Sequence, residues 1–186
     1  IVSEFQNRTG YLVFPNPIKR SVLFLGKFSA SVTAGFMVVT IFYAVLAVLS
    51  MISARGIDDD FLLSFGYAVE FLIAAMAVAY LISSVLKGST GATVLTFFLF
   101  VMILPIIDSV SAFSGAKIEA SLTFSADAMI HILADPYPVD QVVDFGPMIL
   151  NSYYPDQVLA AVTMAAYALA SLVLGMYLFN RKQLAG

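Results

Sequence analysis

Four long apolar stretches limit what this chain can fold into. They occupy residues 28–53, 61–86, 92–113 and 157–180. Each is long enough, at about 20 residues, for a helix to cross the roughly 30 Å hydrocarbon core of a bilayer. A backbone inside the hydrocarbon must satisfy its own hydrogen bonds, and a single helix does so without a partner. The sequence therefore predicts an all-α membrane protein with four transmembrane helices, in a transmembrane domain of residues 21–186.

The composition agrees with a chain surrounded by lipid. Of its 186 residues, 61% are hydrophobic and 11% are charged, whereas soluble domains carry roughly 45–50% apolar and about 25% charged residues. The net charge of −3 offers no basic surface, so no nucleic-acid partner is expected. The absence of cysteine excludes disulfides, thiolate metal sites and a cysteine nucleophile. Stability must then come from helix packing, with membrane lipids as neighbours.

The distribution of charge predicts the orientation of the helices. Seven of the nine basic residues precede the first span, separate the second from the third, or follow the fourth: Arg8, Lys19, Arg20, Lys27, Lys87, Arg181 and Lys182. The alternate segments hold Arg55 and Lys117 together with nine acidic residues. Because basic loops stay in the cytoplasm, we expect a multi-pass protein of the cell membrane with both ends of this chain cytoplasmic.

One connection, residues 114–156, is much longer than the others and is expected to be extracellular. It contains four prolines, so no further span fits: Pro136, Pro138, Pro147 and Pro155. Ser125 is the predicted N-cap of a short helix that ends at Leu133. Residues 145–154 are apolar enough to form a second piece that lies on the bundle in the same way. The sequence predicts a long extracellular helical connection before the last span.

Glu70 and Asp108 are the acidic residues within the predicted spans, and such residues are by default candidates for function. Glu70 shares a helical face with Gly66, Ala74 and Ala77, so it is expected to face packed protein. Asp108 follows Pro105 by about one turn, near the outer end of its helix. A structural hydrogen-bonding role for Glu70 stays equally open, and for Asp108 we favour a hydrated group at the membrane interface.

Two features of the spans concern helix geometry. Pro105 is expected to kink the third helix, because it removes a backbone donor and crowds the preceding turn. In the fourth helix, small residues recur at spacings of three and four: Ala161, Ala165, Ala168, Ser171 and Gly175. Such a stripe lets another helix approach closely. The pattern fits a contact within the chain or a contact between two copies.

No catalytic pattern is visible. His131 is the single histidine, and without cysteine or a carboxylate pair at ligand spacing it builds no zinc site, so we expect no metal. The Lys87-Gly-Ser-Thr90 tetrapeptide lacks the upstream glycine and strand of a phosphate-binding loop. We find no nucleophile–base pair and no paired acids. The chain is therefore not expected to be an enzyme, and any ATP chemistry must come from another chain.

A polar segment, residues 1–20, precedes the first span and carries an apolar patch at 11–14. We expect the first helix to extend back toward Pro17, because residues 21–26 are mostly apolar and proline is tolerated in a first turn. The patch needs a cover, either lipid headgroups or a groove on another protein. The candidate contact residues are Glu4, Arg8, Gly10, Tyr11, Leu12, Val13, Phe14, Pro15, Lys19 and Arg20.

This segment resembles the cytoplasmic link between the second and third spans of type-2 ABC exporter permeases, the ABC-2 family. That link has the form Glu, Arg, Gly-Thr, Leu-Leu, Pro, Arg and then Gly-Lys. Here Thr9-Gly10 replaces Gly-Thr, residues 14–17 replace the single proline, and Lys19-Arg20 fills the basic position before Gly26-Lys27. The resemblance extends over the four spans and the long connection before the last one.

The resemblance implies a transport subunit without its own ATPase site. Residues 4–17 would dock on an ABC ATP-binding subunit, which would bind ATP and magnesium. This chain would be the C-terminal portion of a six-span permease that works as a dimer. Two alternatives stay open: an ion-coupled secondary carrier that uses Glu70 and Asp108, and a structural subunit that packs through the small-residue stripe. The substrate and the choice between homodimer and heterodimer do not follow from the sequence.

Overall fold

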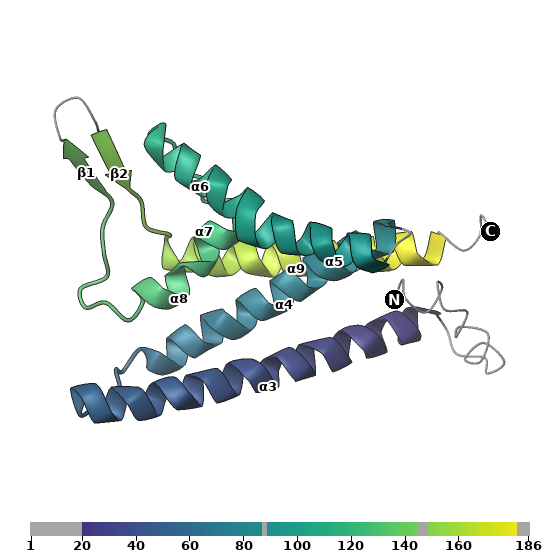
Figure 1. The fold of residues 1–186 in the computed structure, drawn as a ribbon, viewed down its shortest axis with the longest axis horizontal. Coiled ribbons are helices and arrows are strands. Elements are labelled where there is room, and N and C mark those ends of the chain that lie inside the picture. Colours follow the sequence, from purple (N-terminus) through teal and green to yellow (C-terminus); the bar gives the residue numbers. More distant parts are fainter. Residues whose placement is uncertain (1–19, 87–88, 145–148, 182–186) are drawn as a thin grey trace.

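The computed structural model describes residues 20–86, 89–144 and 149–181 (Figure 1). The candidate contact residues from Glu4 to Lys19 lie outside the described residues. Helices and strands have the labels of Figure 1. In chain order they are α3 (Arg20–Ala54), α4 (Phe61–Val85), α5 (Ser89–Phe98), the π-helix η1 (Leu99–Ile103), α6 (Leu104–Phe113), α7 (Leu122–Ala126), α8 (Ala128–His131), β1 (Gln141–Asp144), β2 (Ile149–Ser152) and α9 (Gln157–Arg181).

Four helical segments are long and apolar enough to cross a membrane, which confirms the predicted all-α class with four spans. They are Ser21–Ser53, Phe61–Val85, Thr90–Phe113 and Gln157–Arg181. The first helix begins at Arg20, earlier than residue 28, because the mostly apolar residues 21–26 continue the helix. Figure 1 shows the start of α3 and the end of α9 at one end of the bundle. We name this the basic end, and the opposite end, which carries β1 and β2, the hairpin end.

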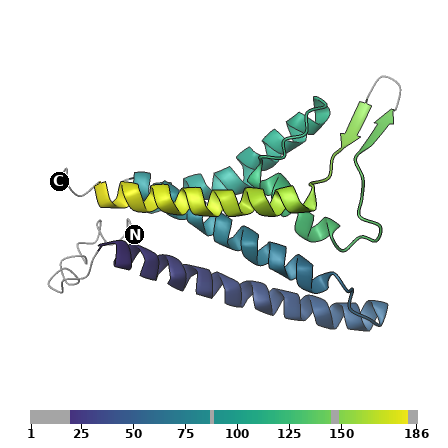
Figure 2. The same ribbon diagram turned by 180° about the vertical axis from the view of Figure 1, so that it is seen from behind.

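Helices α4 and α9 form the centre of the bundle. They run side by side in the same direction, from the hairpin end to the basic end (Figures 1 and 2). The buried face of α4 carries Ser64, Ala68, Ala74, Ala77 and Ser84, and that of α9 carries Ala160, Met164, Ala168, Ser171, Gly175 and Phe179. Most of these residues are small, so the two backbones can approach closely. The Tyr67 hydroxyl also donates to the Gln157 carbonyl at 2.9 Å.

Helix α3 packs on this pair through aromatic side chains. At the basic end the ring of Phe24 meets the rings of Tyr80 and Phe179, each with a centroid distance of 5.6 Å. At the hairpin end Tyr43 meets Phe61 and Phe65 of α4, with centroid distances of 5.4 and 5.2 Å. All of these pairs except the tilted Phe24–Phe179 pair are edge-on, and they add directional contact to the packing. The helix is therefore held against α4 at both of its ends.

The third span is interrupted in its middle by η1. The Leu104 amide donates to the carbonyl of Leu99, five residues earlier, and Pro105 opens α6 directly afterwards. Proline has no amide proton and crowds the preceding turn, and a π-turn at this point widens the helix. Figures 1 and 2 show α6 diverging from α9 beyond η1. The expected distortion at Pro105 thus takes the form of a π-helix.

The short helix of the long connection begins four residues earlier than predicted. Its N-cap is Ser121, whose hydroxyl accepts from the Phe124 amide, so the assignment of Ser125 as the cap was wrong. Ser125 lies inside α7, buried, and donates to the Ser121 carbonyl at 2.9 Å. The helix divides at Asp127 into α7 and α8, and α8 ends at His131 rather than Leu133. Burial of Leu122 beside α9 fixes this earlier start.

The second piece of the connection is a β-hairpin. Strands β1 and β2 pair antiparallel from Gln141 with Ser152 to Asp144 with Ile149, so the prediction of a helical piece over 145–154 was wrong for β2. Residues 145–148 lie outside the described residues. The hairpin is tied to the end of α6, because Asn151 donates to the Ala112 carbonyl at 3.1 Å and Tyr153 to that of Gly115 at 2.9 Å. These long-range bonds favour an extended backbone over a helix.

Replacing Gly175 tests the packing of α4 on α9. A Cβ atom there would lie 3.3 Å from the Leu81 Cα and 3.4 Å from the Phe24 ring, so a Gly175→Leu side chain has no room. We expect the variant to lose about 1–3 kcal/mol of stability, measured as a lower midpoint of thermal unfolding in mild detergent. Gly66→Leu is the control, because nothing lies within 4 Å of a Cβ atom at Gly66. Equal midpoints for the two variants would contradict this packing.

Candidate functional site

Helix α3 directly continues the segment that resembles a coupling element. Of the candidate contact residues, Arg20 is described, as the first residue of α3. From there the helix runs without interruption for 35 residues. At 1.5 Å per residue this is about 50 Å, more than the roughly 30 Å of the hydrocarbon. A displacement of α3 at Arg20 would therefore reach the hairpin end through one helix.

A sharp turn ends α3 at the hairpin end. Arg55 has a φ of 57°, the left-handed conformation that usually closes a helix. The Ser50 hydroxyl donates to the Gly56 carbonyl at 2.7 Å, and the Asp58 carboxylate accepts from the Asp60 amide at 3.0 Å. These local bonds start α4 immediately afterwards, so α3 and α4 form a tight antiparallel pair.

Two hydroxyl groups connect α3 and α4 to the long connection. The Tyr43 hydroxyl lies 2.9 Å from the Ser64 hydroxyl, and Ser64 donates to the Met129 carbonyl on α8 at 2.6 Å. Ser64 is 1% exposed, so the hydroxyl that the two bonds share is buried. Sequence reasoning missed these residues. The available signal was the spacing of four between Ser64 and Ala68, which places both on the buried face of α4.

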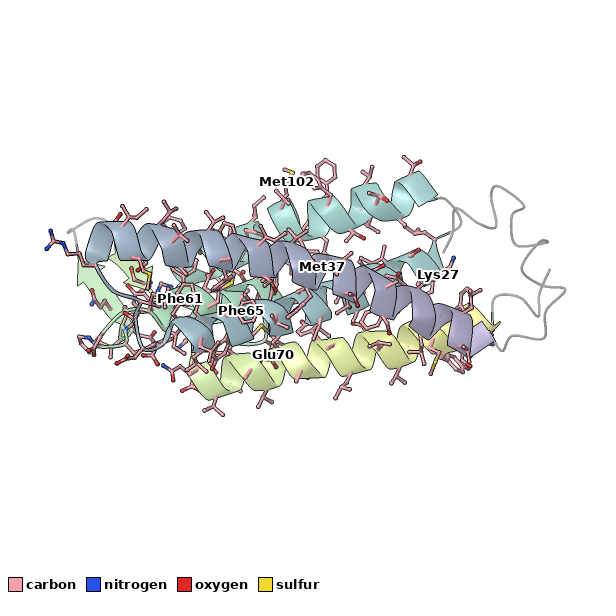
Figure 3. All side chains as sticks on the ribbon, turned by 90° about the horizontal axis from the view of Figure 1, so that it is seen from below. Lys27, Met37, Phe61, Phe65, Glu70 and Met102 are labelled. Carbon is pink, nitrogen blue, oxygen red and sulfur yellow. The ribbon has the colours of Figure 1, made fainter. Side chains whose placement is uncertain are left out.

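Glu70 lies on α4, half-buried, along the helix from Phe61 and Phe65 (Figure 3). Ala74 and Ala77 on its predicted face are buried, but Gly66 is exposed, so the expectation that Gly66 lies in the packed face was wrong. In the part of the chain that the structure describes, no hydrogen bond or ion pair involves the Glu70 carboxylate. Its geometry therefore identifies no partner for an ion-coupled role.

Asp108 connects the third span to α7. One carboxylate oxygen accepts a hydrogen bond from the Thr123 hydroxyl at 2.5 Å. The other, Oδ1, is buried and has no hydrogen-bond partner within the described ranges. A carboxylate held in this way fixes the position of α7 relative to α6. Nothing among residues 20–86, 89–144 and 149–181 bonds Asp108 to Glu70, so the two acidic residues do not form one site.

The small residues of α9 lie against α4 of the same chain. Ala168, Ser171 and Gly175 are buried there. Ala161 and Ala165 are half-buried, because the packed face toward the hairpin end runs through Ala160 and Met164. The sequence left open whether this stripe meets the same chain or a second copy. In the structure its buried part is an intrachain contact.

His131 lies at the end of α8 and contacts a tyrosine. Its ring meets that of Tyr154 edge-on, with a centroid distance of 4.8 Å. The described residues contain no group of three or more histidine, cysteine, aspartate or glutamate side chains that could hold a metal ion. The contact with Tyr154 gives His131 a packing role between α8 and the segment that leads into α9.

An ion network holds the hairpin to the rest of the connection. Lys117 lies 3.0 Å from Asp140 and 3.4 Å from Glu119, and the second oxygen of Asp140 accepts from the Tyr154 amide at 2.7 Å. Burial raises the pKa of Asp140, but the Tyr154 amide and the Lys117 ammonium outweigh burial and hold that pKa below its ordinary value. The ionised carboxylate therefore stabilises this arrangement.

A family model described as "ABC-2 family transporter protein" matches residues 1–184. The chain belongs to the ABC-2 transporter family. This confirms the resemblance seen in residues 1–27 and in the order of the spans. The ABC-2 protein is therefore a multi-pass membrane transport subunit, of a family that is not itself catalytic and typically works with an ABC ATPase subunit. Comparison with curated proteins and with solved structures gives no significant match.

The lowered pKa of Asp140 predicts a pH-dependent contribution of this carboxylate to the hairpin. A group with a depressed folded-state pKa stabilises the fold above its unfolded pKa, and the contribution disappears as pH falls through the folded pKa. We expect Asp140→Asn to accelerate hydrogen exchange of the Tyr154 amide at pH 7 but not at an acidic pH where the Asp140 carboxyl is protonated, after correction for the intrinsic rate. The effect will be small, because the side chain is 41% exposed and solvent screens the pair.

Asp59→Asn is the matched control for this prediction. Asp59 is also an exposed acidic residue. It belongs to the loop between α3 and α4, which lies at the same end of the bundle as the β1–β2 hairpin but apart from it (Figure 1). Its replacement should leave the exchange of the Tyr154 amide unchanged at both pH values. Equal acceleration by Asp140→Asn at both pH values would show that the charge of Asp140 contributes nothing.

Proposed function

We propose that this ABC-2 protein is the permease of an ATP-driven exporter whose ATP and magnesium are bound by a separate ABC ATP-binding subunit. The observation that carries the proposal is the continuity of α3. It begins at Arg20, where the coupling-like segment ends, and runs unbroken to Ala54. Residues 4–17 would dock on the ATP-binding subunit, and their displacement would move α3.

The packing of the bundle supports such a transmission. Helices α4 and α9 share a continuous seam of buried residues, whereas α3 packs on them through aromatic rings near its two ends and through Gly35, which lies against Leu72 of α4. Packed interfaces of this kind switch between discrete arrangements rather than deform gradually. ATP binding by the partner would then shift the population between inward-open and outward-open arrangements of the spans.

The outward faces of α3 and of the third span are apolar and exposed. In each of these two spans, 6% of an 18-residue apolar stretch is buried by the rest of the structure. The corresponding share is 22% in α4 and in α9. Such apolar faces fit membrane lipids and a second permease copy. We propose a dimer in which lipids and the second copy together cover these faces. The basic end would face the cytoplasm and the hairpin end the outside, in agreement with the distribution of basic residues.

The two alternative functions have less support. A carrier that uses Glu70 and Asp108 would need both carboxylates along one ion pathway. In the structure Asp108 bonds to Thr123 of α7, and no hydrogen bond among the described residues joins it to Glu70. A structural subunit that assembles through the small-residue stripe would need that stripe free, and Ala168, Ser171 and Gly175 are covered by α4. The exporter proposal requires neither a shared site for Glu70 and Asp108 nor a free stripe on α9.

Copurification tests the proposed coupling. We expect the full-length protein, purified in mild detergent, to retain an ATP-binding subunit and its ATPase activity. Replacing Tyr11, Leu12, Val13 and Phe14 with serine should reduce the amount of bound subunit about tenfold or more, because apolar anchors dominate most interfaces. The control replaces three exposed apolar residues of the hairpin end with serine: Ile57, Val139 and Val142. An intact protein that retains no ATP-binding subunit would disprove the proposal.

Cysteine labelling tests the orientation. Residues 1–186 contain no cysteine, so a single introduced thiol is the only labelled position among them. We expect Val139→Cys, in the connection, to react with a membrane-impermeant maleimide in intact cells, because Val139 is 70% exposed. Asn180→Cys, exposed at the end of α9, should react only after the cells are permeabilised. Labelling in the reverse order would place the hairpin end in the cytoplasm.

A further inference from the structure

The bonds that join Tyr43, Ser64 and Met129 have a fixed direction. The Ser64 hydroxyl has one proton, and it donates that proton to the Met129 carbonyl at 2.6 Å. The Tyr43 hydroxyl must therefore be the donor in its 2.9 Å contact with the Ser64 oxygen. A continuous chain of donors runs from α3, through α4, to the backbone of α8.

These two hydrogen bonds give α8 a polar connection to the spanning helices. Within the described residues, the Met129 carbonyl accepts no backbone hydrogen bond, and Ser64 supplies its partner. One helical turn is too short to satisfy its own last carbonyls, so this external donor matters. The outer face of α8 has no cover from the described residues, since Ile130 is 62% exposed, while Ala128 is buried on the inner face. The position of α8 thus depends on its contacts with α4, on the ring contact between His131 and Tyr154, and on its junction with α7 at Asp127.

The contribution of Tyr43 to this chain depends on the position of α3. Its ring is held between α3 and α4 by the edge-on contacts with Phe61 and Phe65 (Figure 3 labels both phenylalanines). In a low-dielectric interior, a donor on a hydroxyl oxygen strengthens the bond that the same hydroxyl donates. Moving α3 away from α4 would remove the Tyr43 donor and weaken the bond from Ser64 to Met129.

We propose that Tyr43, Ser64 and Met129 form a latch through which the position of α3 determines whether α8 stays packed on the bundle. The inference rests on the proposed function, because the ATP-binding subunit would be what displaces α3. With α3 in place the latch is closed and α8 covers the hairpin end of α4. When α3 is displaced, the latch loses its first bond, and α8 separates from α4 more readily.

The structure contains a matched control at the opposite end of the same two helices. The hydroxyls of Ser31 on α3 and Tyr80 on α4 lie 2.7 Å apart. This pair has the same chemistry as Tyr43 and Ser64, but it lies at the basic end, far along the bundle from α8. Tyr80→Phe therefore removes a hydroxyl bond between α3 and α4 without changing the latch.

Hydrogen exchange of the full-length complex, followed by mass spectrometry, tests the latch at the amides of residues 128–133. We expect Tyr43→Phe to accelerate exchange there about 1.2- to 1.7-fold, because loss of the Tyr43 donor weakens the bond from Ser64 to Met129 by roughly 10–30%, while the ring contacts of residue 43 remain. Tyr80→Phe should leave these amides unchanged. A nonhydrolysable ATP analogue should accelerate the same amides in the wild-type complex and add nothing further in Tyr43→Phe.

Three results would overturn the latch. They are unchanged exchange in Tyr43→Phe, equal acceleration by Tyr80→Phe, and acceleration spread evenly over α3 and α4, which would indicate general destabilisation. Ser64→Ala is the second variant and should accelerate the same amides, because it removes both bonds. If no ATP-binding subunit copurifies, the proposed function fails, but the comparison of Tyr43→Phe with Tyr80→Phe without nucleotide still decides whether the latch exists.

Discussion

The close contact between α4 and α9 is the interaction on which the other contacts depend. In lipid, apolar side chains gain little by leaving their surroundings, so helices associate through close packing and hydrogen bonds. Alanine, serine and glycine line the shared face of these two helices. At Gly175 the backbone of α4 is so close that an added Cβ atom would lie 3.3 Å from the Leu81 Cα. Helix α3 then packs on the pair through Phe24 and Tyr43, and α7 and α8 lie across its hairpin end.

The spans were predictable because the signal for each is long. A run of about 20 apolar residues is hard to produce in any other fold, so errors were confined to the helix ends, as at Val85, where α4 ends one residue before the predicted end at residue 86. The small-residue stripe of α9 was predicted less well. Met164 replaces the expected Ala165 in the packed face, because a flexible thioether fills a gap that a search for small residues overlooks.

The long connection was harder to predict because its structure depends on distant partners. Ser121 and Ser125 are both suitable caps by local pattern, and burial of Leu122 and Ser125 decides between them. Strand β2 is extended because Asn151 bonds to the end of α6, and such a contact is not visible in local sequence. The carboxylates drew attention because charge is rare in a span, whereas Ser64 is a common residue whose partners lie 21 and 65 positions away.

The arrangement of the connection explains why α3 is suited to control it. Helix α7 lies on α9, where Tyr167 donates to the Ala120 carbonyl at 3.0 Å, and α8 lies on α4. Each of the two short helices thus packs on one member of the central pair, α4 and α9. If α4 and α9 move together as one rigid body, α7 and α8 move with them. A change in the position of α8 relative to α4 therefore requires the movement of an element other than α4 and α9. Helix α3 supplies such an input, since it reaches from the basic end to Ser64 and is connected to α8 through the hydrogen bonds of Tyr43 and Ser64.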